Sequence, residues 1–128
     1  MLSRVAWIAV AGAVGSVLRY LVSLWALRWS PALPLGTFAV NVVGSFLLGL
    51  LMEVGLTTDL VDPNVRTVLA VGLMGGFTTY SSFNYETLEL LRRGSVALGW
   101  LNVGATVAAC LIAGALGVAL GKMIAGRA

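Results

Sequence analysis

The sequence predicts an all-α membrane protein, with four transmembrane helices in a single domain over residues 1–128. Of its 128 residues, 59% are hydrophobic and only 10% are charged, and the mean hydropathy is +0.99. Soluble domains carry about 25% charged residues, so this chain lacks the polar side chains to cover a water-facing surface. At roughly 20 residues per transmembrane helix, its length holds four spans and no separate catalytic domain.

Each predicted span is bounded by a local signal. Pro31 and Pro34 break any helix after the first span. Asp62-Pro63 is typical of an N-cap followed by the first residue of a helix, and a turn at Arg92-Arg93-Gly94 precedes the last span. The four predicted spans cover residues of about 5–27, 36–56, 63–91 and 95–124.

Charge and cysteine content exclude several classes of function. The net charge is +3, but the eight Lys and Arg residues are scattered and form no basic stripe, so we expect no nucleic-acid partner. One Cys and no His leave no set of zinc ligands and no Cys/His nucleophile pair, so we expect no enzyme. The apolar N-terminal run has no small-residue cleavage site before a polar chain, so it is interpreted as the first span rather than a signal peptide. We expect a multi-pass membrane protein, in contact with lipid.

The basic residues give almost no preference for one orientation in the membrane. With four spans, both termini lie on the same side, and the basic residues of that side are Arg4, Arg66, Lys122 and Arg127. The opposite side holds Arg28, Arg92 and Arg93, with Arg19 as a fourth if it snorkels outward. A bias of at most one charge permits insertion both ways up and pairing of two copies as an antiparallel dimer. A weakly biased monomer or a parallel oligomer is the alternative.

The third predicted span contains an unfavourable helix centre. Gly75-Gly76 in mid-membrane, followed by Thr78 and Thr79, predicts a helix broken over Gly75-Gly76-Phe77-Thr78. Such breaks survive only where protein or an aqueous cavity satisfies the backbone. The freed carbonyl oxygens suit an alkali cation. The alternative is that Gly72 and Gly76 form a close-packing notch and that the threonines bond back to their own helix.

Polar residues follow the break along one face of the third span. A rotation of roughly 100° per residue places Thr79, Ser82, Phe83 and Glu86 on one stripe, with Tyr80 to the side. Intramembrane polar residues are costly and normally face the bundle interior or water, so the stripe predicts a permeation or binding track. The positive edges of the Tyr80 and Phe83 rings could face an anion. Interhelical hydrogen bonding and simple packing are the alternatives.

Two further polar lines have four-residue spacing. Asn41 is the strongest single candidate, because its amide can donate two hydrogen bonds to an anion. It belongs to a line in the second span that comprises Thr37, Asn41 and Ser45, with Gly44 beside it. The line in the fourth span comprises Asn102, Thr106 and Cys110, and it could face the other two.

The motifs on three spans together resemble the family of small dual-topology fluoride channels called Fluc or CrcB. They are Gly12-Xaa-Xaa-Gly15 with Leu18-Arg19-Tyr20, Gly36-Thr37 with Val40-Asn41 and Gly44, and Gly75-Gly76-Phe77-Thr78-Thr79-Tyr80-Ser81-Ser82-Phe83 with Glu86. The resemblance covers nearly the whole chain. The motif on the third span is specific, whereas the glycine pair on the first would carry no weight alone.

The resemblance implies an antiparallel homodimer with two pores and a structural Na⁺ at the dimer interface. It also implies passive export of fluoride across the bacterial cytoplasmic membrane, which would confer fluoride resistance. The Na⁺ ligands would be the backbone carbonyls of Gly75 and Thr78 from both subunits. The anion pathway would comprise Asn41, the aromatic positions Tyr80 and Phe83, and the polar residues Ser81, Ser82 and Glu86; we expect Thr37 and Thr106 of the polar lines to join it. Tyr80 departs from the family, which usually has Phe there, and Cys110 stands where several relatives have Ser.

Other function classes fit the sequence less well. A small multidrug-type, proton-coupled exporter also has four spans, but its chemistry needs a carboxylate deep in the first span, where this chain has only Arg19. Glu53 and Glu86 lie near the ends of their predicted helices. A non-transporting assembly subunit is disfavoured by the broken helix and the three polar lines.

Overall fold

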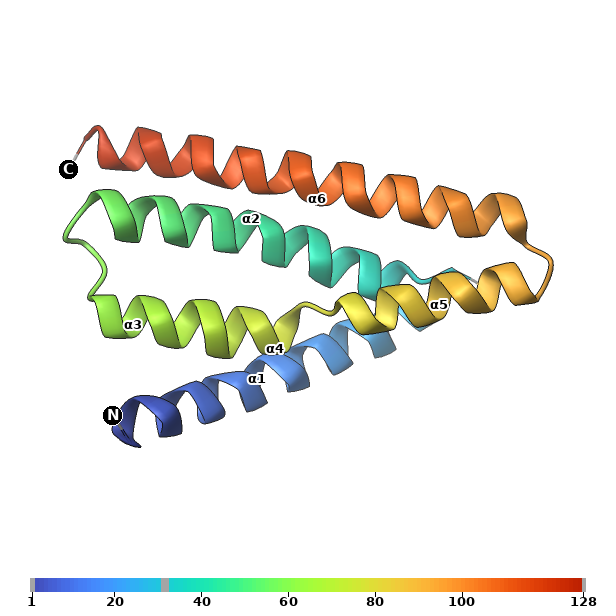
Figure 1. The fold of residues 1–128 in the computed structure, drawn as a ribbon, viewed down its shortest axis with the longest axis horizontal. Coiled ribbons are helices and arrows are strands. Elements are labelled where there is room, and N and C mark those ends of the chain that lie inside the picture. Colours follow the sequence, from blue (N-terminus) through green and yellow to red (C-terminus); the bar gives the residue numbers. More distant parts are fainter. Residues whose placement is uncertain (1, 31–32, 128) are drawn as a thin grey trace.

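The computed structural model describes residues 2–30 and 33–127, and all of its regular structure is helical. The elements are α1 (Leu2–Leu27), α2 (Leu35–Thr57), α3 (Pro63–Thr67), the π-helix η1 (Val68–Met74), α4 (Gly75–Phe77), α5 (Tyr80–Arg92) and α6 (Val96–Ala125). No strand occurs within these described ranges, so the predicted all-α class is confirmed. The helices run lengthwise in an elongated bundle, and both ends of the chain lie at the same end of it (Figure 1).

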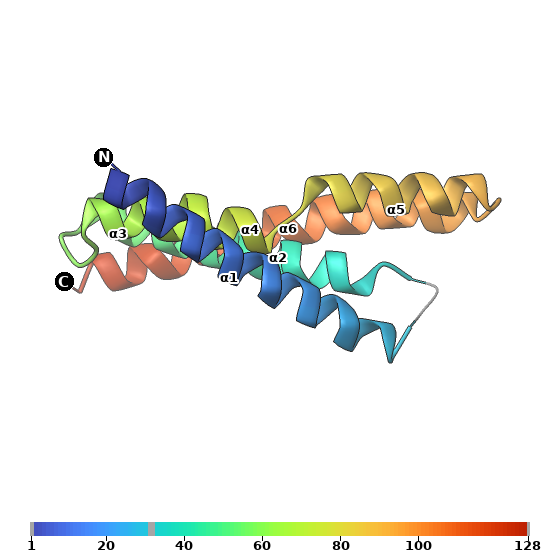
Figure 2. The same ribbon diagram turned by 90° about the horizontal axis from the view of Figure 1, so that it is seen from below.

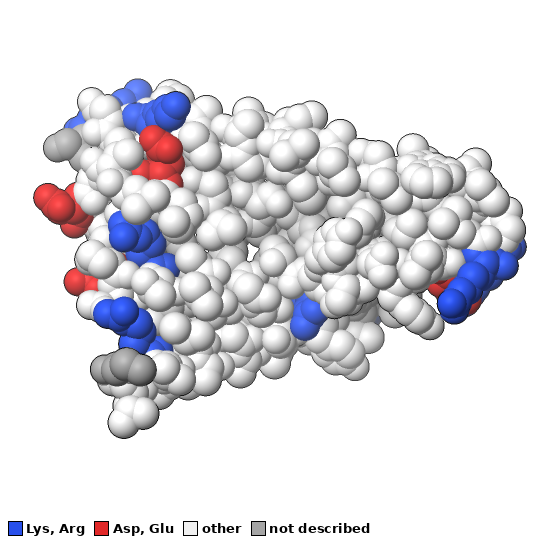
Figure 3. Space-filling view, viewed as in Figure 1, with Lys and Arg blue, Asp and Glu red and all other residues white. Residues whose placement is uncertain are grey.

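The outer surface suits a lipid bilayer. Among the described residues, α1, α2 and α6 are each long and apolar enough to cross a membrane. Charged side chains gather at the two ends of the molecule, and the long middle is almost free of them on the face shown in Figure 3. The third predicted span is not one continuous helix, because α3, η1, α4 and α5 divide it.

The ends of the helices follow the local signals. Asp62 caps α3, as predicted: its Oδ1 accepts hydrogen bonds from the backbone N–H groups of Asn64 at 2.7 Å and Val65 at 3.3 Å. These bonds hold the pKa of the Asp62 carboxyl below its ordinary value. Pro34 immediately precedes α2, whereas the predicted helix breaker Pro31 lies outside the described residues.

Glycines bring the backbones of α1, η1 and α4 into direct contact. A Cβ at Gly15 would collide with the carbonyl oxygen of Leu73, and one at Gly76 would collide with the carbonyl oxygen of Gly12. A Cβ at Gly72 would lie only 2.8 Å from the Cβ of Ala11. The close-packing interpretation of Gly72 and Gly76 is therefore confirmed.

The chain breaks two residues later than the predicted centre of the break. Gly75 has helical angles (φ −62°, ψ −35°) and α4 continues to Phe77, whereas Thr78 and Thr79 are extended, with φ/ψ of −86°/159° and −154°/114°. The prediction that the break lies over Gly75-Gly76-Phe77-Thr78 is thus wrong for its first three residues. Gly76 serves the contact with α1, and the helix ends only where side chains of α2 meet the chain.

The break redirects the chain from one neighbour to another. Before it, η1 and α4 pack against α1. Beyond it, α5 lies beside α6 and diverges from α1, as Figure 2 shows from below. The residues that follow the break therefore face α2 and α6, where the other two polar lines are found.

Candidate functional site

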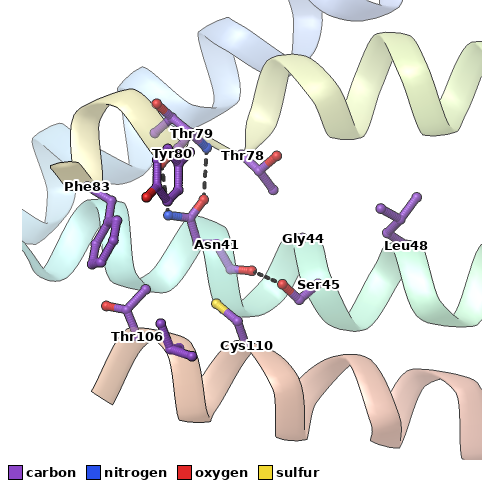
Figure 4. Close-up of a pocket in the computed structure, with 11 residues that line it drawn as sticks. Asn41, Gly44, Ser45, Leu48, Thr78, Thr79, Tyr80, Phe83, Thr106 and Cys110 are labelled. Atoms are coloured by element: carbon purple, nitrogen blue, oxygen red, sulfur yellow. Dashed lines mark hydrogen bonds between the residues drawn. The ribbon is translucent and has the colours of Figure 1, made fainter. Parts of the chain in front are cut away.

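A cavity of about 300 Å³ lies beside the break, between α2, α5 and α6 (Figure 4). The described side chains that line it include Asn41, Ser45, Thr78, Thr79, Tyr80, Phe83, Thr106 and Cys110. Members of all three predicted polar lines thus meet at one place. These residues come from α2, from the break and α5, and from α6, which are separate segments of the sequence. The site therefore forms only when the helices pack together.

Asn41 pairs with the backbone of the break. Its Oδ1 accepts the N–H of Thr79 at 2.8 Å, and its Nδ2 donates to the carbonyl of Thr79 at 3.0 Å. Thr79 is only 7% exposed, so these bonds satisfy two backbone groups that an extended chain would otherwise leave buried without partners. The Asn41 amide has a second N–H, which is still available to an occupant of the cavity.

The hydroxyl of Thr79 organises the first turn of α5. Its Oγ1 accepts the backbone N–H of Ser82 at 3.1 Å, in the manner of an N-cap. The same oxygen lies 3.1 Å from the Ser82 hydroxyl and 3.2 Å from the Ser81 hydroxyl. The predicted site residues Ser81 and Ser82 are therefore gathered around Thr79, with Ser81 exposed and Ser82 half-buried.

The two aromatic candidates differ sharply in burial. Phe83 is 8% exposed and lines the cavity, with its ring near Thr106 in Figure 4. Tyr80 is 79% exposed, although the two ring centroids are 5.7 Å apart and the planes are inclined by 51°. Within one copy of the chain, Phe83 is buried in the bundle, whereas Tyr80 lines the same cavity with most of its surface exposed.

The polar line continues along α5 past Phe83. Glu86, one turn further on, accepts a hydrogen bond from the Thr37 hydroxyl of α2 at 2.8 Å. The second carboxylate oxygen of Glu86 is buried and has no hydrogen-bond partner among the described residues. Glu86 also lines a second cavity, of about 180 Å³, together with Glu89 and Arg93, which form an ion pair at 2.9 Å. The structure thus places polar groups at intervals from the break to the far end of α5.

One polar residue of α5, Thr87, was not among the predicted site residues. Thr87, which is 7% exposed, accepts a hydrogen bond from the Asn102 amide of α6 at 2.9 Å and donates to the carbonyl of Phe83 at 2.7 Å. Thr106 donates to Asn102 over a long 3.5 Å. Thr87 lies four residues after Phe83, so the spacing rule that selected the other residues could have found it.

A profile of the family described as CrcB-like protein, Camphor Resistance (CrcB), matches residues 6–118. The chain belongs to the CrcB family. The match includes the break and every predicted site residue, from Thr37 to Thr106. Membership of the CrcB family and three apolar helices long enough to cross a bilayer make this a multi-pass membrane protein.

Bacterial relatives of known name are similar over almost their whole length. The protein named fluoride-specific ion channel FluC from Sorangium cellulosum (strain So ce56) is 48% identical over 94% of this chain and 96% of its own. The protein of the same name from Anaeromyxobacter sp. (strain K) is 48% identical over 98% of this chain and 100% of its own. That from Geobacter sulfurreducens is 51% identical over 82% of this chain and 86% of its own.

Proposed function

We propose that this chain is a fluoride-specific ion channel through which fluoride leaves the cell passively across the cytoplasmic membrane. The observation that carries the proposal is the 48% identity of nearly the whole chain to proteins with that name. The amide and hydroxyl side chains that meet at the largely apolar cavity support it, because polar side chains in a membrane are costly and normally face the bundle interior or water. A channel is not an enzyme, in keeping with the absence of a nucleophile-base pair from the sequence.

The chemistry of the anion pathway follows from the size of fluoride. Fluoride is small and strongly hydrated, so a pore must replace its lost water with several close hydrogen-bond donors, and a narrow pore excludes the larger chloride. The remaining N–H of Asn41 is a donor at the cavity, and the edge of the Phe83 ring offers partial positive charge. Thr106 lines the same cavity, and its hydroxyl would have to exchange Asn102 for the ion in order to donate to it. The proposed pathway continues through the polar line that comprises Thr37, Ser81, Ser82 and Glu86, with Tyr80 beside it.

The proposal includes four membrane crossings and an antiparallel pair of copies. The segment from α3 to α5 would form the third crossing; the location of both chain ends at one end of the bundle supports this even number (Figure 1). The near balance of basic residues on the two sides supports insertion in both orientations. Gly75, Tyr80 and Ser81 are exposed beside the break, where a second copy would cover them.

The proposed cofactor is a structural Na⁺ held by the carbonyls of Gly75 and Thr78 from both copies. No backbone N–H among the described residues donates to either oxygen: the Thr79 N–H bonds to Asn41, and the Ser82 N–H bonds to the Thr79 hydroxyl. Carbonyl oxygens are hard ligands, and a site without a carboxylate favours a monovalent ion over Ca²⁺ or Mg²⁺, whose dehydration it cannot offset. When bound, Na⁺ supplies fixed positive charge between the copies.

Efflux from liposomes that contain the purified protein tests the function. We expect rapid loss of fluoride and negligible loss of chloride. Exchange of Na⁺ for a bulky organic cation should reduce fluoride efflux, without any Na⁺ flux in its presence. Equal loss of the two halides would contradict fluoride specificity, and Na⁺ flux coupled to fluoride would make the protein a symporter.

Reporters fused to the C-terminus test the orientation. We expect signals from both sides of the membrane, because the charge bias is at most one residue. Two or three Arg residues added to one side should lock the orientation and reduce function, and coexpression of oppositely locked copies should restore it. A signal from one side alone would refute dual insertion.

A further inference from the structure

We infer that Asn41 is a positioning residue for the proposed cation site: by binding the backbone of Thr79, it keeps the carbonyl oxygens of Gly75 and Thr78 free for a cation. This inference rests on the Na⁺ site proposed above. It assigns to Asn41 a role separate from any contact with the anion.

The geometry of the break shows what Asn41 prevents. In a continuous helix, the N–H of Thr79 would donate to the carbonyl of Gly75, four residues earlier. In the structure, that N–H donates to Asn41 Oδ1 at 2.8 Å, and Asn41 Nδ2 donates to the Thr79 carbonyl at 3.0 Å. The side-chain amide therefore takes the place of the helical partner of Thr79, and the Gly75 oxygen loses its donor.

The carbonyl oxygen of Thr78 is freed by a second change of hydrogen-bond partner, which is linked to the first. In a continuous helix it would accept the N–H of Ser82, but that N–H bonds to the Thr79 hydroxyl at 3.1 Å. This N-cap arrangement requires Thr79 to be extended (φ −154°, ψ 114°). Because Asn41 holds Thr79 in that conformation, its influence reaches both proposed ligand oxygens.

A second contact from α2 supports the same arrangement. A Cβ at Gly44 would collide with the methyl group of Thr78, so the absence of a side chain at Gly44 admits the other residue of the break. Asn41 and Gly44 are three residues apart on one face of α2. The residue before Asn41, Val40, is fully buried and fixes that turn of the helix in the bundle. The break is thus shaped by α2 and not only by its own sequence.

The consequence is that one side chain serves both ion sites. Asn41 uses one N–H and its oxygen for the Thr79 backbone, and its remaining N–H belongs to the cavity proposed for fluoride. Loss of the Asn41 amide should therefore weaken cation binding as well as fluoride passage. A residue that only contacted the anion would leave cation binding unchanged.

The test is the thermal stability of the purified full chain as a function of Na⁺, with a bulky organic cation replacing Na⁺ at constant ionic strength. A cation that binds only the folded protein raises the melting temperature with concentration. Asn41→Leu has a similar volume and lacks both hydrogen bonds, so the Na⁺ concentration for half of the stabilisation should rise at least tenfold. Asn102→Leu is the matched control, because it removes an amide that bonds α5 away from the break. It should lower the melting temperature while the Na⁺ midpoint stays unchanged.

Two further measurements keep the inference testable if Asn41→Leu does not fold. Asn41→Ala removes both hydrogen bonds with the Thr79 backbone without adding a charge or a bulky side chain, so its Na⁺ response should also weaken. In the unsubstituted protein, the Thr79 amide should exchange slowly with deuterium. A wild-type Na⁺ midpoint in the Asn41 variants, or rapid exchange at Thr79, would overturn the inference alone. No Na⁺ response in the unsubstituted protein would overturn the Na⁺ site and this inference together, and would leave fluoride transport to be judged from efflux.

Discussion

The chain before the break and the chain after it are held in the bundle by different kinds of contact. Before the break, η1 and α4 lie against α1 through glycines, with backbone against backbone. After it, α5 is joined to α2 and α6 by hydrogen bonds between polar side chains, including Thr37 to Glu86 and Asn102 to Thr87. Thr78 and Thr79 separate the two regions.

The difference shows why the cavity occurs where it does. A contact of the kind made by Gly76 brings two backbones together and excludes every added atom between them. Hydrogen-bonded side chains have additional donors and acceptors, and they can exchange a protein partner for an ion or for water. The region before the break therefore supplies a close-packed support and, at its end, the proposed Gly75 ligand, whereas the region after it supplies most of the polar side chains.

The largest effect is expected from a side chain added to the glycine-packed region. Gly76→Val should abolish folding or lower stability by far more than the ~1–3 kcal/mol typical of an overpacked core, because its Cβ would meet the Gly12 backbone, which cannot rotate away. The measurement is the yield of monodisperse protein and its melting temperature. Gly104→Ala, with open space around its Cβ, is the control and should be nearly neutral. Equal stability of the two variants would contradict the backbone contact.

A large effect on transport is expected from the ring at the cavity. Phe83→Ile keeps an apolar side chain but removes the positive ring edge, so fluoride efflux should fall about tenfold, equivalent to ~1.4 kcal/mol in the barrier. Tyr80→Phe keeps a ring and should have a smaller effect. Efflux rates from liposomes, together with melting temperatures, separate ring electrostatics from packing. An unchanged rate in Phe83→Ile would remove this ring from the pathway.

A moderate effect is expected from the bond between α5 and α6. Asn102→Ala and Thr87→Val should each destabilise the protein by about 0.5–1.5 kcal/mol. Because each variant removes the same hydrogen bond of 2.9 Å, the double variant should be destabilised by less than the sum of the two single variants. A double-mutant cycle on the melting transition measures this coupling. Strict additivity would show that Asn102 and Thr87 do not interact energetically.

The smallest effect is expected at the start of α3, where the packed region begins. The backbone N–H of Asn64 and, to a smaller extent, that of Val65 donate to the Asp62 carboxylate. These hydrogen bonds favour its ionised form and lower its pKa from the ordinary value of 3.8. The cap therefore stabilises the folded protein fully above pH 3.8, and this contribution is lost as the pH falls through the lower pKa of the folded state. Asp62→Asn should show a smaller loss of melting temperature than the unsubstituted protein between pH 6 and about pH 2. Identical pH profiles would contradict a role for this carboxylate.

Much of the site could be predicted from spacing, and some of it could not. The rule of about 100° per residue grouped Thr79, Ser82, Phe83 and Glu86. In the structure Thr79 and Glu86 bond to α2, and Phe83 lines the cavity that α2 and α6 share, whereas Ser82 bonds to Thr79. The same rule could not show that Asn41 binds the backbone of Thr79. Nor could it show that Tyr80 is exposed whereas Phe83 is buried, because exposure depends on which neighbouring helix the chain meets after the break.

Local composition and periodicity suffice for the all-α class, the apolar helices and the cap at Asp62, because each depends on residues within a turn or two of one another. The position of the break depends on more distant contacts. Gly75-Gly76 is the weakest helix former in its segment, yet it stays helical, and Gly76 packs there directly against the backbone of α1. The helix ends instead at Thr78 and Thr79, where Asn41, 38 residues before Thr79 in the chain, offers better hydrogen bonds than a further helical turn. Competition between a helix and a distant side chain is settled only when the bundle forms.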